Sequence, residues 1–171
     1  MKSPGPFLEP AKMIVNGYHS GYTHANRLSN RDENSLGAQP VSSKVRILYL
    51  EDEKDLVTLV QLVLSRQGYQ IIGARSLAQA KEIIEQERID LFFLDLNLPD
   101  GSGWEMLDYL SQHIQYANTP KIIMSAQAMD PQRSAEREHL NNFSAVIGKP
   151  FQVNALIDVT QQTLRNARSS H

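Results

Sequence analysis

The chain has 171 residues, a net charge of -2 at pH 7 and no cysteine. Its length suits one ordinary domain with an additional tail. The charge lacks the basic footprint that is typical of nucleic-acid-binding proteins, so we expect no direct binding to DNA or RNA. Without cysteine, disulfides and thiolate metal sites are excluded. The chain has no secretory signal and no apolar run of about 18 residues, so the sequence predicts a cytoplasmic protein that does not insert into membranes.

Residues 1–43 differ in composition from the rest of the chain. They are rich in proline and glycine, and their apolar residues follow no helical period for two turns. Such a segment cannot bury enough surface to offset the entropy lost on ordering, so we predict a flexible N-terminal extension. Met13 to Val15 form a candidate docking motif, and His19 and His24 are candidate metal ligands. An unselected leader and a solvated tail are the simpler interpretations.

The first strand–helix unit begins at Val45. The β-rich apolar run 45–50 predicts a strand, and the segment 55–67 has the spacing of a helix with one buried face. Gly68 follows this helix as an expected C′ residue. The predicted buried face consists of Leu56, Leu59, Val60, Val63 and Leu64.

The next two units repeat this pattern. A short strand at 71–74 precedes Ser76, which is an expected N-cap. The run 91–94 is wholly apolar, as in a central parallel strand that is covered on both faces, and 103–111 predicts the helix that follows it. The inward positions of these two helices are Leu77, Ala80, Ile83, Ile84, Met106, Leu107 and Leu110.

The last two units complete a domain that we place at 44–167, with a frayed C-terminus at 168–171. Strands are predicted at 121–124 and 145–147, and between them Asp130-Pro131 opens a polar helix over 131–140. The final helix carries an apolar stripe that consists of Val153, Leu156, Ile157, Thr160 and Leu164. Five such units predict an α/β protein of flavodoxin-like fold, a five-stranded parallel sheet with helices on both faces.

Chemically active side chains follow four of the predicted strands. They are Glu51-Asp52-Glu53, Asp95, Ser125 and Lys149. Ligands of open α/β sheets bind at the carboxyl ends of the strands, so we expect these residues to meet on one rim. Each of them taken singly has an ordinary alternative role as a helix cap, a loop residue or a surface lysine. Their shared placement at four strand ends favours a functional site.

The acids of this rim predict a Mg²⁺ site. Clustered carboxylates repel one another unless a cation lies between them, and Mg²⁺ prefers oxygen ligands together with several waters. Asp52 and Asp95 are candidate direct ligands, and Glu51 is a candidate ligand through water. A backbone carbonyl near Asn97 is a candidate for completing the set.

The same rim suits phosphoryl transfer. The Asp95 carboxylate is a competent nucleophile for a phosphorus centre. Lys149 and Ser125 are placed to donate to phosphoryl oxygens, and transfer needs this neutralisation of charge. The added charge would draw both side chains, and the loops attached to them, toward the site.

Four strings in the chain resemble the response-regulator receiver domain of two-component systems, in particular its single-domain, chemotaxis-regulator-like members. They are Ile47 to Glu53, Phe92 to Gly103, Ile122 to Ala126 and Gly148 to Phe151. The strings resemble, in that order, the acidic opening of the domain, its phosphoacceptor strand and loop, its hydroxyl-bearing strand and its lysine motif. The resemblance covers the whole predicted domain.

This resemblance implies that a sensor histidine kinase or a histidine phosphotransfer protein transfers a phosphoryl group to Asp95. It implies Mg²⁺ as the cofactor, held by Glu51, Asp52, Asp95 and the backbone carbonyl of Asn97. The only turnover it implies is self-phosphorylation from a phosphodonor and slow hydrolysis of the acyl phosphate, without an external substrate.

The resemblance also assigns residues around the phosphoryl group. Ser125, Ala126 and Lys149 correspond to the family's phosphoryl-binding and switch positions, and Asn97 and Gln127 to the positions that tune hydrolysis. The family further implies a cis Lys149-Pro150 bond. Receivers often dimerise through their helix 4 to helix 5, which makes a homodimer a further expectation.

Two positions depart from the family's pattern. The first acid is Glu51, where aspartate is commoner, and this conservative change should preserve metal binding. Receivers usually carry an aromatic residue three positions before the lysine, whereas this chain has Val146. Because valine has no ring to report phosphorylation, output is expected to use the helix 131–140 and the loop before it, or a small population shift.

The chain ends soon after its last predicted helix, so we expect a stand-alone regulator that signals by altered binding to a partner or passes its phosphoryl group along a relay. The main alternative, motivated by Val146, is a phosphorylation-independent interaction module. A metal-dependent phosphatase or another flavodoxin-like enzyme is a third interpretation, although no general acid or substrate pocket is evident. A flavin-binding role lacks the phosphate-binding loop after the first strand.

Overall fold

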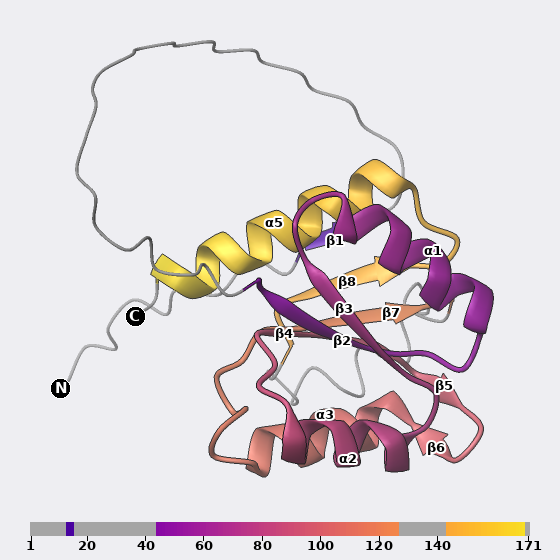
Figure 1. Cartoon of the computed structure of the whole chain (residues 1–171), viewed down its shortest axis with the longest axis vertical. Helices are drawn as coiled ribbons and strands as arrows, with labels where there is room; N and C mark the ends of the chain where they lie inside the picture. The colour runs from indigo at the N-terminus through magenta and orange to yellow at the C-terminus, as the bar shows by residue number, and fades with distance from the viewer. Residues whose placement is uncertain (1–12, 16–43, 127–142, 170–171) are drawn as a thin grey trace, which may run out of the picture.

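A computed structural model describes residues 13–15, 44–126 and 143–169, and it contains a parallel sheet with helices on both faces (Figure 1). Within these residues the main sheet has six strands in the order β1-β8-β7-β4-β2-β3, and all neighbouring strands run parallel. Its strands are β1 (Met13–Val15), β2 (Arg46–Leu50), β3 (Gln70–Ala74), β4 (Leu91–Asp95), β7 (Lys121–Ser125) and β8 (Ala145–Gly148). The flavodoxin-like fold and the five predicted strands are therefore confirmed.

Among the described residues, four helices cover the sheet in two layers (Figure 1). The helices are α1 (Lys54–Ser65), α2 (Leu77–Gln86), α3 (Gly103–Gln112) and α5 (Val153–Ser169). The buried residues of α1 and α5 share one apolar cluster, and those of α2 and α3 share the other. The predicted helix 131–140 lies outside the described residues. Helix α5 continues to Ser169, past the predicted end of the domain at 167.

The alternation of side chains along the strands explains the two clusters. In β2, Leu48 and Leu50 belong to the cluster under α2 and α3, while Ile47 and Tyr49 belong to the cluster under α1 and α5. Successive strand residues point to opposite faces, so a strand covered on both sides must be apolar throughout. Every residue of β4 is buried, in agreement with its wholly apolar prediction.

The buried face of α1 differs from the prediction. Val57, Val60 and Leu64 are buried, whereas Leu59 is 42% exposed. Of the predicted face, Val60 and Leu64 are buried and Leu56 and Val63 pack against the same cluster, so the prediction was wrong at Leu59. The physical reason is that α1 packs on β3 at Gly73, where an added Cβ would lie 2.8 Å from the Val57 Cγ1. The missing side chain lets Val57 approach the sheet and rotates Leu59 toward solvent.

The remaining helices agree more closely with the sequence. Ser76 caps α2, because its hydroxyl accepts a hydrogen bond from the Gln79 amide at 3.1 Å. All predicted inward positions of α3 are buried. In α5 the predicted Leu156, Thr160 and Leu164 are buried together with Val159 and Thr163, but Val153 is 42% exposed. Val153 is the first residue of this helix, where fewer neighbours cover it.

Two small features were not predicted. The strand β1 lies within the predicted extension 1–43 and forms the edge of the sheet, where it pairs with β8 and places Ile14 opposite Val146. The rest of the extension lies outside the described residues. A two-stranded antiparallel ribbon of β5 (Asn97–Leu98) and β6 (Gly101–Ser102) fills the loop between β4 and α3.

Candidate functional site

The predicted site residues lie where the strands end. Glu51 follows β2 directly, and Asp95 and Ser125 are the last residues of β4 and β7. Lys149 follows β8. Because β2, β4, β7 and β8 are consecutive and parallel in the sheet, their carboxyl ends form one continuous rim. This order brings together side chains that are far apart in the sequence.

Three carboxylates of the rim converge. One carboxylate oxygen from each of Glu51, Asp52 and Asp95 lies within 4.8 Å of the other two. Glu51 is 1% exposed and Asp95 is 6% exposed, while Asp52 is exposed. The cluster therefore has a buried floor and one acid that faces solvent.

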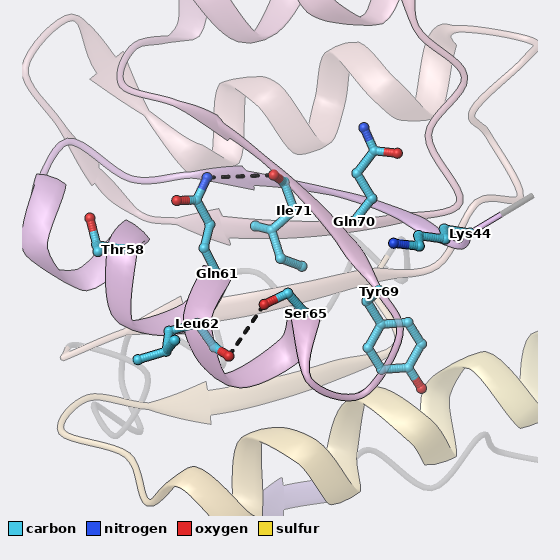
Figure 2. A pocket seen from close by; sticks show the side chains of 8 residues that line it. All are labelled: Lys44, Thr58, Gln61, Leu62, Ser65, Tyr69, Gln70 and Ile71. Atoms are coloured by element: carbon cyan, nitrogen blue, oxygen red, sulfur yellow. Dashed lines mark hydrogen bonds between the residues drawn. The ribbon is translucent and has the colours of Figure 1, made fainter.

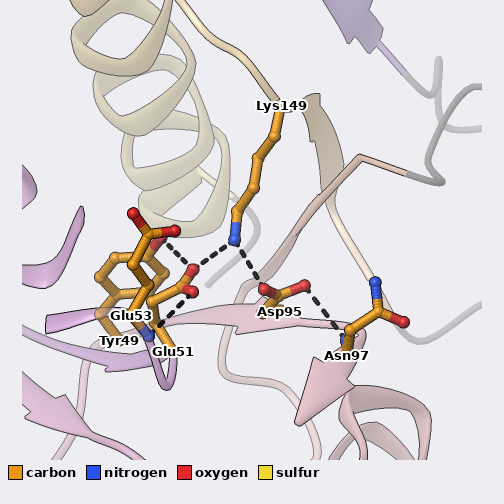
Figure 3. Close-up of polar contacts among 6 residues, drawn as sticks. All are labelled: Tyr49, Glu51, Glu53, Asp95, Asn97 and Lys149. Atoms are coloured by element: carbon orange, nitrogen blue, oxygen red, sulfur yellow. Dashed lines mark hydrogen bonds and ion pairs between the residues drawn. The ribbon is translucent and has the colours of Figure 1, made fainter. Parts of the chain in front are cut away.

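Lys149 lies between the two buried acids (Figure 3). Its Nζ donates to the Asp95 Oδ2 at 2.6 Å and also contacts the Glu51 Oε2. The Lys149-Pro150 peptide bond is cis, as the resemblance implied. One ammonium offsets one of three carboxylate charges, so the cluster retains excess negative charge that favours a further cation.

The backbone joins the hydroxyl-bearing strand to the lysine loop. Ser125 is fully buried and lies opposite Gly148 in the sheet register. The Lys149 amide donates to the Ser125 carbonyl at 3.2 Å. Ala126 follows in an exposed turn, and Gln127 lies outside the described residues. The hydrogen bond therefore ties the end of β7 to the loop that carries Lys149.

The loop after Asp95 fixes the orientation of its carboxylate. The Asn97 amide donates to the Asp95 Oδ1 at 3.2 Å, opposite the oxygen that meets Lys149 (Figure 3). Gly103 begins α3 so close to this turn that an added Cβ would lie 1.9 Å from the Asp95 carbonyl oxygen. Only glycine permits this approach of the helix to the end of β4.

Asp100 ties the same loop to the neighbouring helix. Its carboxylate accepts hydrogen bonds from the Leu77 and Ala78 amides at the start of α2, at 3.0 and 3.3 Å. The bond from the Leu77 amide, followed by that from Ala78, holds the pKa of Asp100 below its ordinary value. At the other end of the loop, Ser102 and Glu105 form a capping box on α3.

A tyrosine that the sequence analysis did not single out also belongs to the site. Tyr49 is fully buried in β2, and its hydroxyl donates to the Glu51 Oε2 at 2.7 Å. Burial, and secondarily this hydrogen bond, raises the pKa of Tyr49 far above its ordinary value, so the phenol stays protonated. The signal in the sequence was the spacing of two residues, which places Tyr49 and Glu51 on the same side of a strand.

A hollow of about 530 Å³ lies elsewhere, beside α1 and the starting ends of β2 and β3 (Figure 2). Its lining consists of Lys44, Thr58, Gln61, Leu62, Ser65, Tyr69, Gln70 and Ile71. Two polar side chains of this lining are bonded to backbone carbonyls: the Gln61 amide donates to the Ile71 carbonyl, and the Ser65 hydroxyl donates to the Leu62 carbonyl. The lining has no carboxylate or histidine, so the hollow lacks the acid cluster's capacity for metal or phosphoryl chemistry.

The acid cluster fits a small divalent cation. Glu51, Asp52 and Asp95 offer hard oxygen ligands, and the exposed Asp52 leaves a side of the cluster open to water. Mg²⁺ takes one or two carboxylates and keeps several waters, which is the arrangement that these residues permit. The donor set therefore agrees with the predicted cofactor.

The family model for the response regulator receiver domain matches residues 47–161. The chain belongs to this family. The match runs from the second residue of β2 into α5 and contains the acids of the rim, Ser125 and Lys149. Receiver domains generally bind Mg²⁺ at such an acidic cluster and interact with histidine kinases.

Curated relatives include regulators of different length. The polar-differentiation response regulator DivK of Brucella anthropi is 27% identical over 121 residues, which cover 71% of this chain and 97% of DivK. The response regulator protein PilR of Pseudomonas aeruginosa is 32% identical over 84 residues, 49% of this chain. The chain spans 18% of the length of PilR and 50% of the transcriptional regulatory protein GltR from the same organism.

Solved structures support the fold. A sensor protein from Polaromonas sp. JS666 has a TM-score of 0.67 and 27% identity, with 73% of this chain and 99% of that chain covered. A CheY-like receiver domain protein from Methanospirillum hungatei has a TM-score of 0.69 and 23% identity, with 75% and 100% covered. Among the described residues, no helix is long and apolar enough to cross a membrane.

Proposed function

We propose that this receiver domain accepts a phosphoryl group on Asp95 and that the modified domain binds a downstream protein with altered affinity. The observation that carries the proposal is the surroundings of Asp95. Its carboxylate is buried, held from both sides by Lys149 and the Asn97 amide, and adjacent to two further acids. The expected donors are a histidine kinase or a histidine phosphotransfer protein.

The transfer is a displacement at phosphorus. An Asp95 carboxylate oxygen forms the new P–O bond while the P–N bond of the donor's phosphohistidine breaks. The leaving imidazole nitrogen keeps the electron pair and then takes a proton from solvent. The contacts from Lys149 and Asn97 orient the carboxylate before the donor arrives, which lowers the entropic part of the barrier.

The acids beside Asp95 would hold the cofactor. Asp52 and Asp95 are the proposed direct ligands of Mg²⁺, with Glu51 acting through water and the Asn97 carbonyl completing the set. When bound, the ion supplies neutralisation of the charge that develops on the phosphoryl oxygens. The Lys149 ammonium, which contacts both Glu51 and Asp95, supplies a second positive charge at the site.

The modified site would draw its neighbours inward. A phosphoryl group adds negative charge and strong acceptor oxygens, to which the Lys149 ammonium and the Ser125 hydroxyl are placed to donate. The Ala126 backbone is the proposed third contact. Because the Lys149 amide is bonded to the Ser125 carbonyl, both strand ends respond together. Asn97 and Gln127 are proposed to tune the later hydrolysis.

Intact-mass measurement with acetyl phosphate tests this proposal. The wild type should gain one phosphoryl mass in the presence of Mg²⁺ and none when EDTA is added. Asp95→Asn should gain no phosphoryl mass. Asp158→Asn is the control and should gain the same mass as the wild type, because Asp158 is an exposed acid on α5 and does not belong to the acid cluster. A folded wild-type protein that takes up no phosphoryl group would contradict the proposal.

A phosphorylation-independent interaction module is the second candidate, and Val146 favours it. This side chain is half-buried and packs against the apolar cluster under α2 and α3. It has no ring that could exchange between inward and outward positions. If unphosphorylated Asp95→Asn bound a downstream protein as tightly as the phosphorylated wild type, the second candidate would be favoured.

Several further expectations accompany the leading proposal. The helix 4 to helix 5 homodimer, the absence of nucleic-acid binding, the cytoplasmic location and the stand-alone organisation stay predictions. Size-exclusion chromatography with light scattering, before and after phosphorylation, tests the first of them.

A further inference from the structure

Tyr49 places a single polar atom beneath the acid cluster. Its ring packs edge-on against Phe93, its register partner in β4, with ring centroids 5.8 Å apart. The hydroxyl is the only hydrogen-bonding group of an otherwise apolar side chain, and it reaches Glu51 at 2.7 Å. The two aromatic residues thus form a floor directly below the acids that end the same two strands.

The Glu51 carboxylate is held asymmetrically. Its Oε2 accepts from both the Tyr49 hydroxyl and the Lys149 ammonium, whereas, among the residues that the structure describes, its Oε1 accepts only from the Glu53 amide, at a long 3.4 Å. A carboxylate oxygen that already has two strong donors is a poor candidate for another partner. Oε1 would therefore be the oxygen that is available to a water held by the ion, and the hydrogen bond from Tyr49 sets which way this oxygen faces.

This hydrogen bond depends on glutamate rather than aspartate. An aspartate at position 51 would retract the carboxylate by one carbon–carbon bond, about 1.5 Å. The contact of 2.7 Å with Tyr49 would then exceed hydrogen-bonding distance. Tyr49 and the longer acid thus act as a pair.

The pair also explains how Lys149 can leave Glu51. Under the proposed function, Lys149 turns toward the phosphoryl group, and Glu51 loses its ion-pair partner. A carboxylate that is 1% exposed would then have lost one of its two strong donors, which is costly. The Tyr49 hydroxyl remains bonded to it and reduces that cost.

We propose that Tyr49 is a positioning residue that orients the Glu51 carboxylate for Mg²⁺ and keeps it satisfied when Lys149 moves. The inference rests on the proposed function for the second role, while the first concerns metal binding alone. Glu51 stands where aspartate is commoner in the family, and the inference gives this longer acid a hydrogen-bonding partner, Tyr49, in the strand that precedes it.

A double-mutant cycle tests the pairing. Isothermal titration with Mg²⁺ should give about three- to tenfold weaker binding for Tyr49→Phe, the range that corresponds to the loss of one ordinary hydrogen bond. In the Glu51→Asp background, Tyr49→Phe should have no further effect, because the shorter acid does not reach the hydroxyl. Equal losses in both backgrounds, or unchanged Mg²⁺ affinity in Tyr49→Phe, would overturn the proposal.

Tyr116→Phe is the matched control. Tyr116 is also a buried tyrosine, but its hydroxyl bonds the carbonyls of Ile84 and Glu87, away from the acids. This variant should lower the free energy of unfolding and leave Mg²⁺ affinity unchanged. If it weakened Mg²⁺ binding as much as Tyr49→Phe does, the effect would be general loosening of the core and the proposal would fail.

The cycle is distinguishable from the test of phosphorylation. Urea unfolding in EDTA should show the same coupling between positions 49 and 51 without metal or phosphodonor. A wild type that binds Mg²⁺ and shows the coupling, but takes up no phosphoryl group, would refute the proposed function and retain the orienting role of Tyr49. A wild type that is phosphorylated without coupling would refute Tyr49's role alone.

Discussion

Replacement of Lys149 by methionine tests how the rim balances its charge. The substitution keeps most of the side-chain volume and removes the ammonium from between Glu51 and Asp95. The attraction across the 2.6 Å contact with Asp95 is about 6 kcal/mol at an effective dielectric constant of ~20. Most of it offsets the desolvation of the charges, and loss of one partner from a buried pair typically costs about 3–5 kcal/mol. Because the Lys149 side chain is still 16% exposed, we expect a loss near the lower end, about 3 kcal/mol without metal.

Mg²⁺ should recover much of this loss. A divalent cation bound by the same acids relieves the repulsion that the ammonium normally offsets, so the variant should gain more stability from the ion than the wild type does. Urea unfolding of both proteins with EDTA and with saturating Mg²⁺ measures the difference. Equal stabilisation of the two proteins by Mg²⁺, or no loss of stability in EDTA, would refute this account of the rim's electrostatics.

Four further substitutions test the loop after Asp95 and the fold that surrounds it. Gly103→Ala should lower the free energy of unfolding by about 3 kcal/mol and slow phosphorylation, because the new Cβ would lie 1.9 Å from the Asp95 carbonyl oxygen. Gly68→Ala is the comparison. Its Cβ would meet no atom within 4 Å, but the residue has a φ of +86°, so the loss should be only about 1 kcal/mol. Burial lowers the pKa of Lys121 to about 8 from 10.5, so the unfolded chain binds more protons between these values. The stability of the wild type relative to Lys121→Met should therefore rise with pH across that window, by at most about 1.4 kcal/mol per pH unit in urea titrations, and a flat difference would contradict it. The pKa of Asp100 is lowered in the folded protein, so its carboxylate stabilises the fold above pH 3.8, and this stabilisation is lost as the pH falls through the pKa of the folded state. Asp100→Asn should therefore lower the melting temperature at pH 6. In thermal melts at a pH below the folded-state pKa, the variant and the wild type should melt alike.

The sheet was predictable because its strands carry their own signal. The run Leu91 to Leu94 is apolar at every position, and the structure buries all of it. The rotation of α1 was not predictable from its own residues. Leu59 and Val57 are both apolar, and the choice between them depends on Gly73 in another element, whose missing side chain receives Val57. Helical spacing gives an apolar face, but its exact centre is set by what it packs against.

The sequence likewise predicted some residues of the site and missed others. Glu51, Asp95, Ser125 and Lys149 were predictable because each ends a recognisable strand, and parallel strands place those ends together. Tyr49 was missed because an aromatic residue within a strand is usually a core residue, and its hydrogen bond to Glu51 depends on the position of a second side chain. The strand β1 was missed because three apolar residues acquire a partner only when the edge of β8 is present.

The central claim is that Asp95 is the phosphoryl acceptor, and chemical trapping tests it most directly. Protein treated with acetyl phosphate and Mg²⁺ is reduced with borohydride, which converts an aspartyl phosphate to homoserine, and then digested for peptide mass spectrometry. The account predicts homoserine at position 95 and no conversion at Asp52 or Asp100. Unmodified Asp95 in a protein that has gained a phosphoryl group, or conversion at another acid, would contradict it.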